Sequence, residues 1–156
     1  MAAVHPIPAG YSSITPYLII KGAAAALEFY RKVFGAEQTL RLDGPDGRVG
    51  HAEIRIGTSN IMLADEPPQS PDTRSPESLG GTPVGIMLYI ADVDSIVDLA
   101  LAAGATLIRP VKDQFYGDRL GSIRDPFGHI WHIATHIEDL APEELARRAA
   151  EAGKGA

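Results

Sequence analysis

The chain has 156 residues, 45% of them apolar, and its 14 basic and 20 acidic residues give a net charge of −6. This length suits one domain or two coupled half-domains, and the acidic balance argues against nucleic acid or an anionic membrane as partner. The absence of cysteine excludes a disulfide framework, a thiolate nucleophile and a sulfur metal site. No apolar run reaches the about 18 residues of a membrane span, and no signal peptide is evident, so we expect a cytoplasmic protein.

Elements in the first half follow one another as a strand, a helix and three more strands. An apolar strand at 14–20 leads into an amphipathic helix at 23–34, which ends at Gly35. Turn residues at 43–47 separate the next two strands, and another apolar strand follows at 60–65. This order predicts a β-α-β-β-β module.

The strand after the turn has one polar and one apolar face. His51, Glu53 and Arg55 alternate with three apolar residues. Period two places the three ionisable side chains on one face of the sheet and the apolar ones on the other.

A proline-rich segment joins the two halves. Residues 66–83 contain five prolines and show no hydrophobic period. A loop of this length is usually disordered or functional. We expect a linker that is the most mobile internal segment and a candidate lid.

The second half repeats the order of the first. A strand at 84–90 leads into a helix at 92–103, three strands follow, and a tail begins its helix at Pro142. From the start of the first strand to the glycine after the helix is 21 residues in the first half and 20 in the second. Because self-similarity dictates architecture, we expect an α+β fold of two β-α-β-β-β modules. The expected arm, first module, linker, second module and tail span 1–12, 13–65, 66–83, 84–139 and 140–156.

Two motifs give these modules a family resemblance. They are LEFYRKVFGA at 27–36 and RDPFGHIWHIATHIED at 124–139. With the duplication, they resemble the vicinal oxygen chelate superfamily, which includes glyoxalase I, bleomycin-resistance proteins, fosfomycin-resistance enzymes and extradiol dioxygenases. The PhnB-like branch is the most similar. The resemblance covers residues 12–139 and implies an open barrel that encloses a cleft. We also expect a homodimer, because each half-sheet leaves an edge that needs cover.

The resemblance further implies four positions for a divalent metal ion, at Thr15, Leu63, Gly85 and His132. Only His132 is a good ligand, whereas a catalytic metal needs at least three nitrogen or oxygen ligands. We therefore expect no bound metal and no other cofactor. An alternative cluster of His51, Glu53 and His132 keeps a metal-dependent reaction open.

Strand alternation places candidate ligand-binding side chains on the concave faces of the sheets. These are Tyr17, His51, Glu53, Arg55, Met87, Tyr89, Arg119 and His132. His132 and Glu53 are also candidate catalytic acid or base groups. The alternative is that His132 hydrogen-bonds a neighbour and that Glu53 forms a surface ion pair.

Aromatic residues supply the remaining candidates. Tyr17, Tyr89, Phe115 and Tyr116 form either ordinary packing contacts or a stacking wall for a flat ligand. Trp131 alternates with Ile133, which predicts a core position.

Two classes of function remain open. The first is a metal-independent protein that sequesters a flat or antibiotic-like small molecule, as bleomycin-resistance relatives do. The second is a metal-dependent lyase or isomerase of glyoxalase type that acts on a small oxygenated substrate. The missing metal ligands favour the first class, and the His51, Glu53 and His132 cluster keeps the second.

Overall fold

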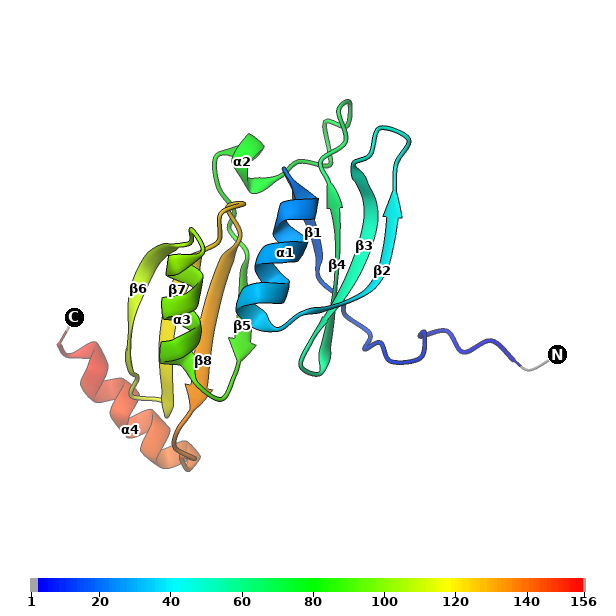
Figure 1. Ribbon diagram of the computed structural model, residues 1–156. Helices are drawn as coiled ribbons and strands as arrows, with labels where there is room; N and C mark the ends of the chain where they lie inside the picture. The colour runs from blue at the N-terminus through cyan, green and yellow to red at the C-terminus, as the bar shows by residue number, and fades with distance from the viewer. Residues whose placement is uncertain (1–2, 156) are drawn as a thin grey trace. The chain divides into compact units, whose positions relative to one another are not determined.

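The computed structural model describes residues 3–155, which form two compact units with the boundary between Gly81 and Thr82. Unit 1 precedes this boundary and unit 2 follows it. Each unit holds a four-stranded sheet with one helix across a face (Figure 1).

Unit 1 contains a helix and four strands in the predicted order, followed by a short second helix. The elements are β1 Tyr17–Ile20, α1 Ala23–Phe34, β2 Glu37–Asp43, β3 Val49–Ile56, β4 Ser59–Asp65 and α2 Pro76–Leu79. The strand order is β1-β4-β3-β2. β1 runs parallel to β4, and the other neighbours are antiparallel.

Unit 2 repeats this topology. Its elements are β5 Gly85–Tyr89, α3 Val93–Ala102, β6 Thr106–Asp113, β7 Asp118–Arg124, β8 Ile130–His136 and α4 Pro142–Gly153. The strand order is β5-β8-β7-β6, and only β5 and β8 are parallel neighbours. The two expected β-α-β-β-β modules are therefore confirmed, although neither sheet closes into a barrel.

The core of unit 1 lies between α1 and one face of its sheet. Leu27, Tyr30 and Val33 are buried on α1 at helical spacing, and Ile54 and Leu63 are buried on the strands. The helix ends where Gly35 adopts a φ of +67°, a left-handed conformation that favours glycine.

The core of unit 2 lies between α3 and the equivalent face of the second sheet. Ile123, Trp131 and Ile133 are buried there, which confirms the predicted core position of Trp131. The indole Nε1 of Trp131 donates a hydrogen bond of 2.9 Å to Asp125 Oδ2. Asp125 also accepts hydrogen bonds from the turn that precedes β8, so the DPFG motif anchors the core tryptophan.

In both units the last strand caps the first helix. Asp65 Oδ1 accepts from the backbone N–H groups of Gly22 and Ala23 at 3.1 and 2.8 Å. In unit 2, Thr135 Oγ1 accepts from Val93 N at 3.0 Å. Asp65 and Thr135 occupy equivalent positions. Asp65 lies three residues after Met62, the register partner of Tyr17, and Thr135 lies three residues after His132, the register partner of Met87.

The segment expected to be a mobile linker contains α2 and a carboxylate that organises it. Glu66 Oε2 accepts from the hydroxyls of Ser75 and Ser78 at 2.6 and 2.7 Å, and Glu66 Oε1 accepts from Arg74 at 2.9 Å. Ser75 also caps α2 through Ser78 N. These hydroxyls hold the pKa of Glu66 at about 2, below its ordinary value of 4.5. The segment is thus locally folded, and its mobility stays a prediction.

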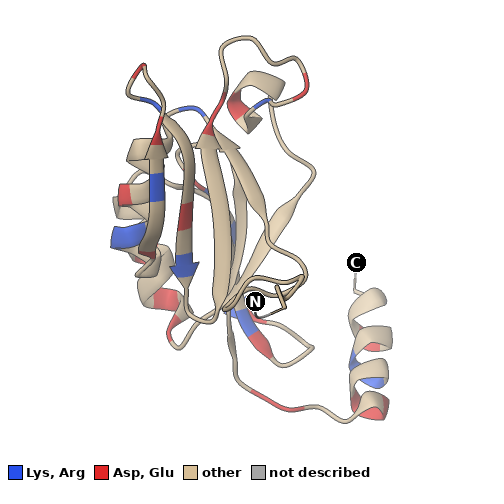
Figure 2. Cartoon of the chain, turned by 90° about the vertical axis from the view of Figure 1, so that its right-hand side faces the viewer, with Lys and Arg blue, Asp and Glu red and all other residues tan. Residues whose placement is uncertain are grey.

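Acidic and basic residues are interspersed along the elements (Figure 2). In α4, for example, Arg147 pairs with Glu144 and Glu151. None of the helices within residues 3–155 has the length and apolar character that a membrane crossing requires.

Candidate functional site

The face of the unit 1 sheet opposite α1 carries a cluster of polar and aromatic side chains. Glu53 and Tyr17 both pair in register with Met62 of the intervening strand β4. His51 lies one alternation further along β3 and therefore projects from the same face. The structure thus brings together Tyr17, His51 and Glu53, three of the predicted site residues.

Hydrogen bonds join these side chains into a chain across the sheet. The hydroxyl of Tyr17 lies 2.7 Å from His51 Nδ1, and His51 Nε2 lies 3.0 Å from Glu53 Oε1. The other oxygen of Glu53 accepts a hydrogen bond from the hydroxyl of Tyr11. Tyr11 belongs to the N-terminal arm, which Asn60 fixes by a 2.6 Å hydrogen bond to Gly10 O.

The surroundings shift the pKa values of this cluster in opposite directions. Hydrogen bonds from His51 and then Tyr11 lower the pKa of Glu53, which therefore remains a carboxylate. Burial, followed by the charge of Glu53, raises the pKa of Tyr17. The hydrogen bond to Glu53 raises the pKa of Tyr11. Both tyrosines therefore keep their protons at neutral pH.

A pocket of about 480 Å³ lies in unit 1 and includes Tyr17 in its wall. Its apolar lining consists of Tyr17, Ile19, Val49, Ala64, Pro67 and Pro68. The carboxylates that line it already have partners: Asp46 pairs with Arg48, Asp65 caps α1 and Glu66 binds the α2 serines. The pocket is therefore an apolar slot beside a tyrosine ring.

In unit 2, His132 lies on the face of the sheet opposite α3. We call the faces opposite α1 and α3 the open faces of the two sheets. Ser122 Oγ lies 2.7 Å from His132 Nδ1, and Ser122 is fully buried. The imidazole also covers Gly85, since a Cβ added at residue 85 would stand 2.5 Å from His132 Nε2. Met87 pairs in register with His132 and shares its face. This arrangement agrees with the alternative prediction, in which His132 hydrogen-bonds a neighbouring side chain.

Tyr89 belongs to a second polar group at the end of the unit 2 sheet. Its hydroxyl donates to Asp118 Oδ2 at 2.8 Å, and Asp118 is buried. The other oxygen of Asp118 lies 2.7 Å from His136 Nδ1, and His136 Nε2 lies 2.8 Å from Asp139. These two carboxylates, Asp118 first, raise the pKa of His136.

The predicted position of Arg119 on the open face is wrong. Arg119 pairs in register with Thr135, whose side chain caps α3, so both residues face the helix. Its guanidinium binds Asp94 of α3 at 2.7 and 2.8 Å and Asp113 at 2.9 Å. The prediction took the wrong parity along β7, because pairing with β8 puts Ser122 opposite His132 on the open face and therefore Arg119 on the other face. Arg55 does lie on the open face of unit 1, where it is exposed and donates to Gly57 O.

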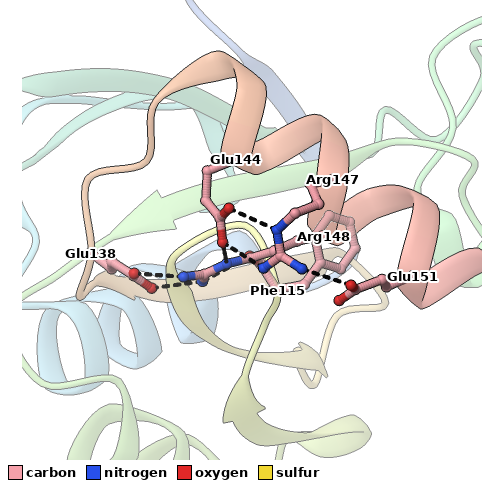
Figure 3. Close-up of polar contacts among 6 residues, drawn as sticks. All are labelled: Phe115, Glu138, Glu144, Arg147, Arg148 and Glu151. Carbon is pink, nitrogen blue, oxygen red and sulfur yellow. Dashed lines mark hydrogen bonds and ion pairs between the residues drawn. The ribbon is translucent and has the colours of Figure 1, made fainter.

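Phe115 and Tyr116 lie together in the turn between β6 and β7. Their rings meet edge to face, with centroids 5.2 Å apart. Arg148 of α4 reaches this turn, with Nη1 donating to Phe115 O at 3.4 Å while the guanidinium binds both oxygens of Glu138 (Figure 3). The tail helix is thereby tied to the aromatic turn.

The residues present do not fit the metal site of the resembled family. Register pairs Met62 with Tyr17 as it pairs His132 with Met87, so Met62, and not Leu63, is the counterpart of His132. The assignment of Leu63 was one residue off, because that side chain is buried beneath α1. A methionine replaces the expected carboxylate, and the His132 ring fills the space where a side chain at residue 85 would project.

The alternative metal cluster also lacks suitable geometry. His51 Nε2 and Glu53 Oε1 are already engaged with each other at 3.0 Å. Within the part of the chain that the structure describes, no three histidine or acidic residues are grouped to hold a metal ion.

Five residues of these clusters were not predicted: Ser122 and Tyr11, and Asp118, His136 and Asp139 of the group around Tyr89. Ser122 could have been found by counting outward from the DPFG turn, since that hairpin places it opposite His132. No sequence pattern pointed to Tyr11, because the sequence does not show where the N-terminal arm lies relative to the sheet.

Comparison with known proteins identifies the family of the chain. Residues 12–133 match the model of the Glyoxalase/Bleomycin resistance protein/Dioxygenase superfamily. An uncharacterised protein of Mycobacterium bovis is 41% identical over 145 residues, which cover 92% of this chain and 95% of that protein.

Solved structures share the fold. TioX from Micromonospora sp. ML1 has a TM-score of 0.63 and 26% identity over 81% of this chain and 99% of its own. A PhnB protein from Bacillus cereus, described as a putative 3-demethylubiquinone-9 3-methyltransferase, has a TM-score of 0.64 and 18% identity over 80% and 99%. Together with the two β-α-β-β-β modules, these matches establish that the chain belongs to the glyoxalase/bleomycin resistance/dioxygenase superfamily, also called the vicinal oxygen chelate superfamily.

Proposed function

We propose that the protein binds a flat, polar aromatic small molecule and that it does so without a metal ion. The observation that carries this proposal is the unit 1 pocket of about 480 Å³, walled by Tyr17 and apolar side chains. Ligand sites of this size, mainly apolar with a few directed polar groups, are typical of small-molecule binding. Sequestration of such a ligand is the activity that we infer.

The side chains at the family's metal positions favour binding over glyoxalase-type chemistry. Met62 offers only a thioether where a hard divalent ion needs oxygen or nitrogen, and residue 85 offers no side chain. His132 has its Nδ1 engaged by Ser122. A Lewis-acid mechanism would need at least two further ligands, which these residues do not supply.

Exposed edge strands support the proposal that the protein is a homodimer. Every residue of β2 is exposed, including Leu40 and Leu42, and β2 forms one edge of its sheet. Unpaired edges invite pairing with another chain. Light scattering after gel filtration, with a mass near twice 16.6 kDa, is the expected result.

Ligand titration of protein treated with a chelator tests the proposed function. We expect planar aromatic compounds to bind the treated protein, and Tyr17→Ala to weaken that binding by at least about tenfold, as loss of a buried aromatic anchor does. Tyr89→Ala and His132→Ala probe the open face of unit 2. Binding that needs an added divalent ion, or that survives Tyr17→Ala but not His132→Ala, would contradict the placement in unit 1.

A further inference from the structure

The hydrogen-bond chain on the open face of unit 1 has a defined direction. Glu53, as a carboxylate, only accepts, so His51 Nε2 carries the hydrogen of the 3.0 Å bond. In a neutral imidazole the other nitrogen is then an acceptor, and Tyr17 donates its phenolic hydrogen to His51 Nδ1 at 2.7 Å. A carboxylate thus orients a histidine whose basic nitrogen faces a hydroxyl, which is the arrangement that activates hydroxyl groups in catalytic triads.

The surrounding structure holds this chain in place. Tyr17 on β1 reaches across β4 to His51 on β3, so two strands fix the two ends of the 2.7 Å contact. Tyr11 of the N-terminal arm donates to the second oxygen of Glu53. The side chains of His51 and Glu53 are 25% and 18% exposed, which limits competition from water.

Tyr17, the first residue of the hydrogen-bond chain, also lines the pocket. Its hydroxyl oxygen keeps a lone pair after donating to His51. The other charged groups nearby have partners of their own: Asp46 binds Arg48, and Arg55 donates to Gly57 O. A ligand hydroxyl in the pocket can therefore donate a hydrogen bond to the Tyr17 oxygen, and Tyr17 in turn is hydrogen-bonded to His51, the base.

We propose that Tyr17, His51 and Glu53 form a proton relay that binds a phenolic ligand as its phenolate. The ligand O–H bond breaks as its proton moves to the Tyr17 oxygen, while the Tyr17 proton moves to His51 Nδ1. The products are a phenolate ligand, a neutral tyrosine and an imidazolium that faces the Glu53 carboxylate. The net result is that the ligand has lost one proton and His51 has gained one, and no oxidant or reductant is needed.

This inference rests on the proposed function and narrows its ligand class. Apolar walls accept any small aromatic ring, but only a ligand with an ionisable hydroxyl can give a proton to the relay. A methyl ether of the same ring fills the same space without that proton. The relay therefore predicts discrimination between a phenol and its ether, whereas simple packing in the pocket does not.

Titration with 4-nitrophenol and 4-nitroanisole tests the relay, because nitrophenol absorbs differently as phenol and as phenolate. With the wild-type protein, at a pH where free nitrophenol is mostly neutral, we expect the bound ligand to show the phenolate spectrum. We also expect nitrophenol to bind at least about tenfold tighter than nitroanisole. Tyr17→Phe and His51→Gln should remove both effects, so that each variant binds nitrophenol and nitroanisole with affinities within about twofold of each other. Tyr11→Phe, which acts only through Glu53, should weaken the phenolate signal while retaining discrimination.

The possible results distinguish failure of the relay proposal from failure of the proposed binding function. Equal affinity for the two ligands, or a phenolate spectrum that persists in Tyr17→Phe, would overturn the relay and leave the proposed binding function standing. Failure of both ligands to bind would count against the pocket as well. In the free protein, nitrogen NMR of the imidazoles should show His51 with its hydrogen on Nε2, and the opposite tautomer would also overturn the proposal.

Discussion

Asp65 is expected to be the most important single polar side chain for the stability of unit 1. Its carboxylate accepts three backbone N–H groups: Gly22 and Ala23 at the start of α1, and Val49 at the start of β3, the last at 2.8 Å. Gly22 precedes the helix and has no side chain to cap it. Replacing Asp65 with alanine therefore leaves the first turn of α1 and the entry to β3 without their acceptor.

The size of the effect follows from counting these bonds. A net hydrogen bond contributes about 1 kcal/mol, and a negative charge at a helix N-terminus contributes about 0.5 kcal/mol more. With three such bonds, Asp65→Ala should thus lower the free energy of unfolding by about 3.5 kcal/mol. Asp65→Asn keeps one carbonyl oxygen for α1 and should cost about half as much. The matched variant Thr135→Val removes one 3.0 Å bond to the start of α3, which Asp92 also caps through Ser95 N at 3.1 Å, and should cost about 1 kcal/mol.

Urea unfolding followed by two probes provides the assay. Far-UV circular dichroism reports both units, whereas fluorescence reports unit 2, because Trp131 is the only tryptophan in the chain. With a urea dependence of about 2 kcal/mol per molar, Asp65→Ala should lower the dichroism midpoint by about 1.7 M. A loss below about 1 kcal/mol, or a larger loss for Thr135→Val than for Asp65→Ala, would refute this reasoning.

Two carboxylate networks should give stability a measurable pH dependence. Because Glu66 has a pKa of about 2 in the folded state against 4.5 ordinarily, its contribution is present above pH 4.5 and is lost as the pH falls toward 2. Glu66→Gln should remove that slope in urea midpoints, while Glu77→Gln, at an exposed position near Lys21, should not. The pKa of His136 is raised above 6.5, so its contribution is complete below pH 6.5 and is lost as the pH rises through the folded-state value. His136→Asn should flatten this part of the profile, and an unchanged profile would show that the Asp118 and Asp139 contacts do not contribute.

Local patterns were enough to predict most of the fold. Helical spacing of apolar residues placed α1 within its observed bounds, and Gly35 ended it where a left-handed conformation is needed. Alternation in β3 placed His51 and Glu53 together, because side chains two residues apart in a strand share a face whatever the rest of the fold does. The same rule failed for Arg119, because the face of each β7 residue is set by pairing with β8, which places Arg119 opposite Thr135.

Sequence alone could not give the partners of the side chains it singled out. The motifs determined the superfamily and the duplicated topology, since those depend on periodicity and on turns that are local in the chain. The contacts of Tyr11 with Glu53, of Tyr17 with His51 and of Ser122 with His132 join residues 10 to 42 positions apart. Such contacts depend on which strands become neighbours and in which register, and these are set by burial of the whole apolar face. Only the tertiary structure therefore decided that a tyrosine, a histidine and a glutamate form one chain beside a pocket.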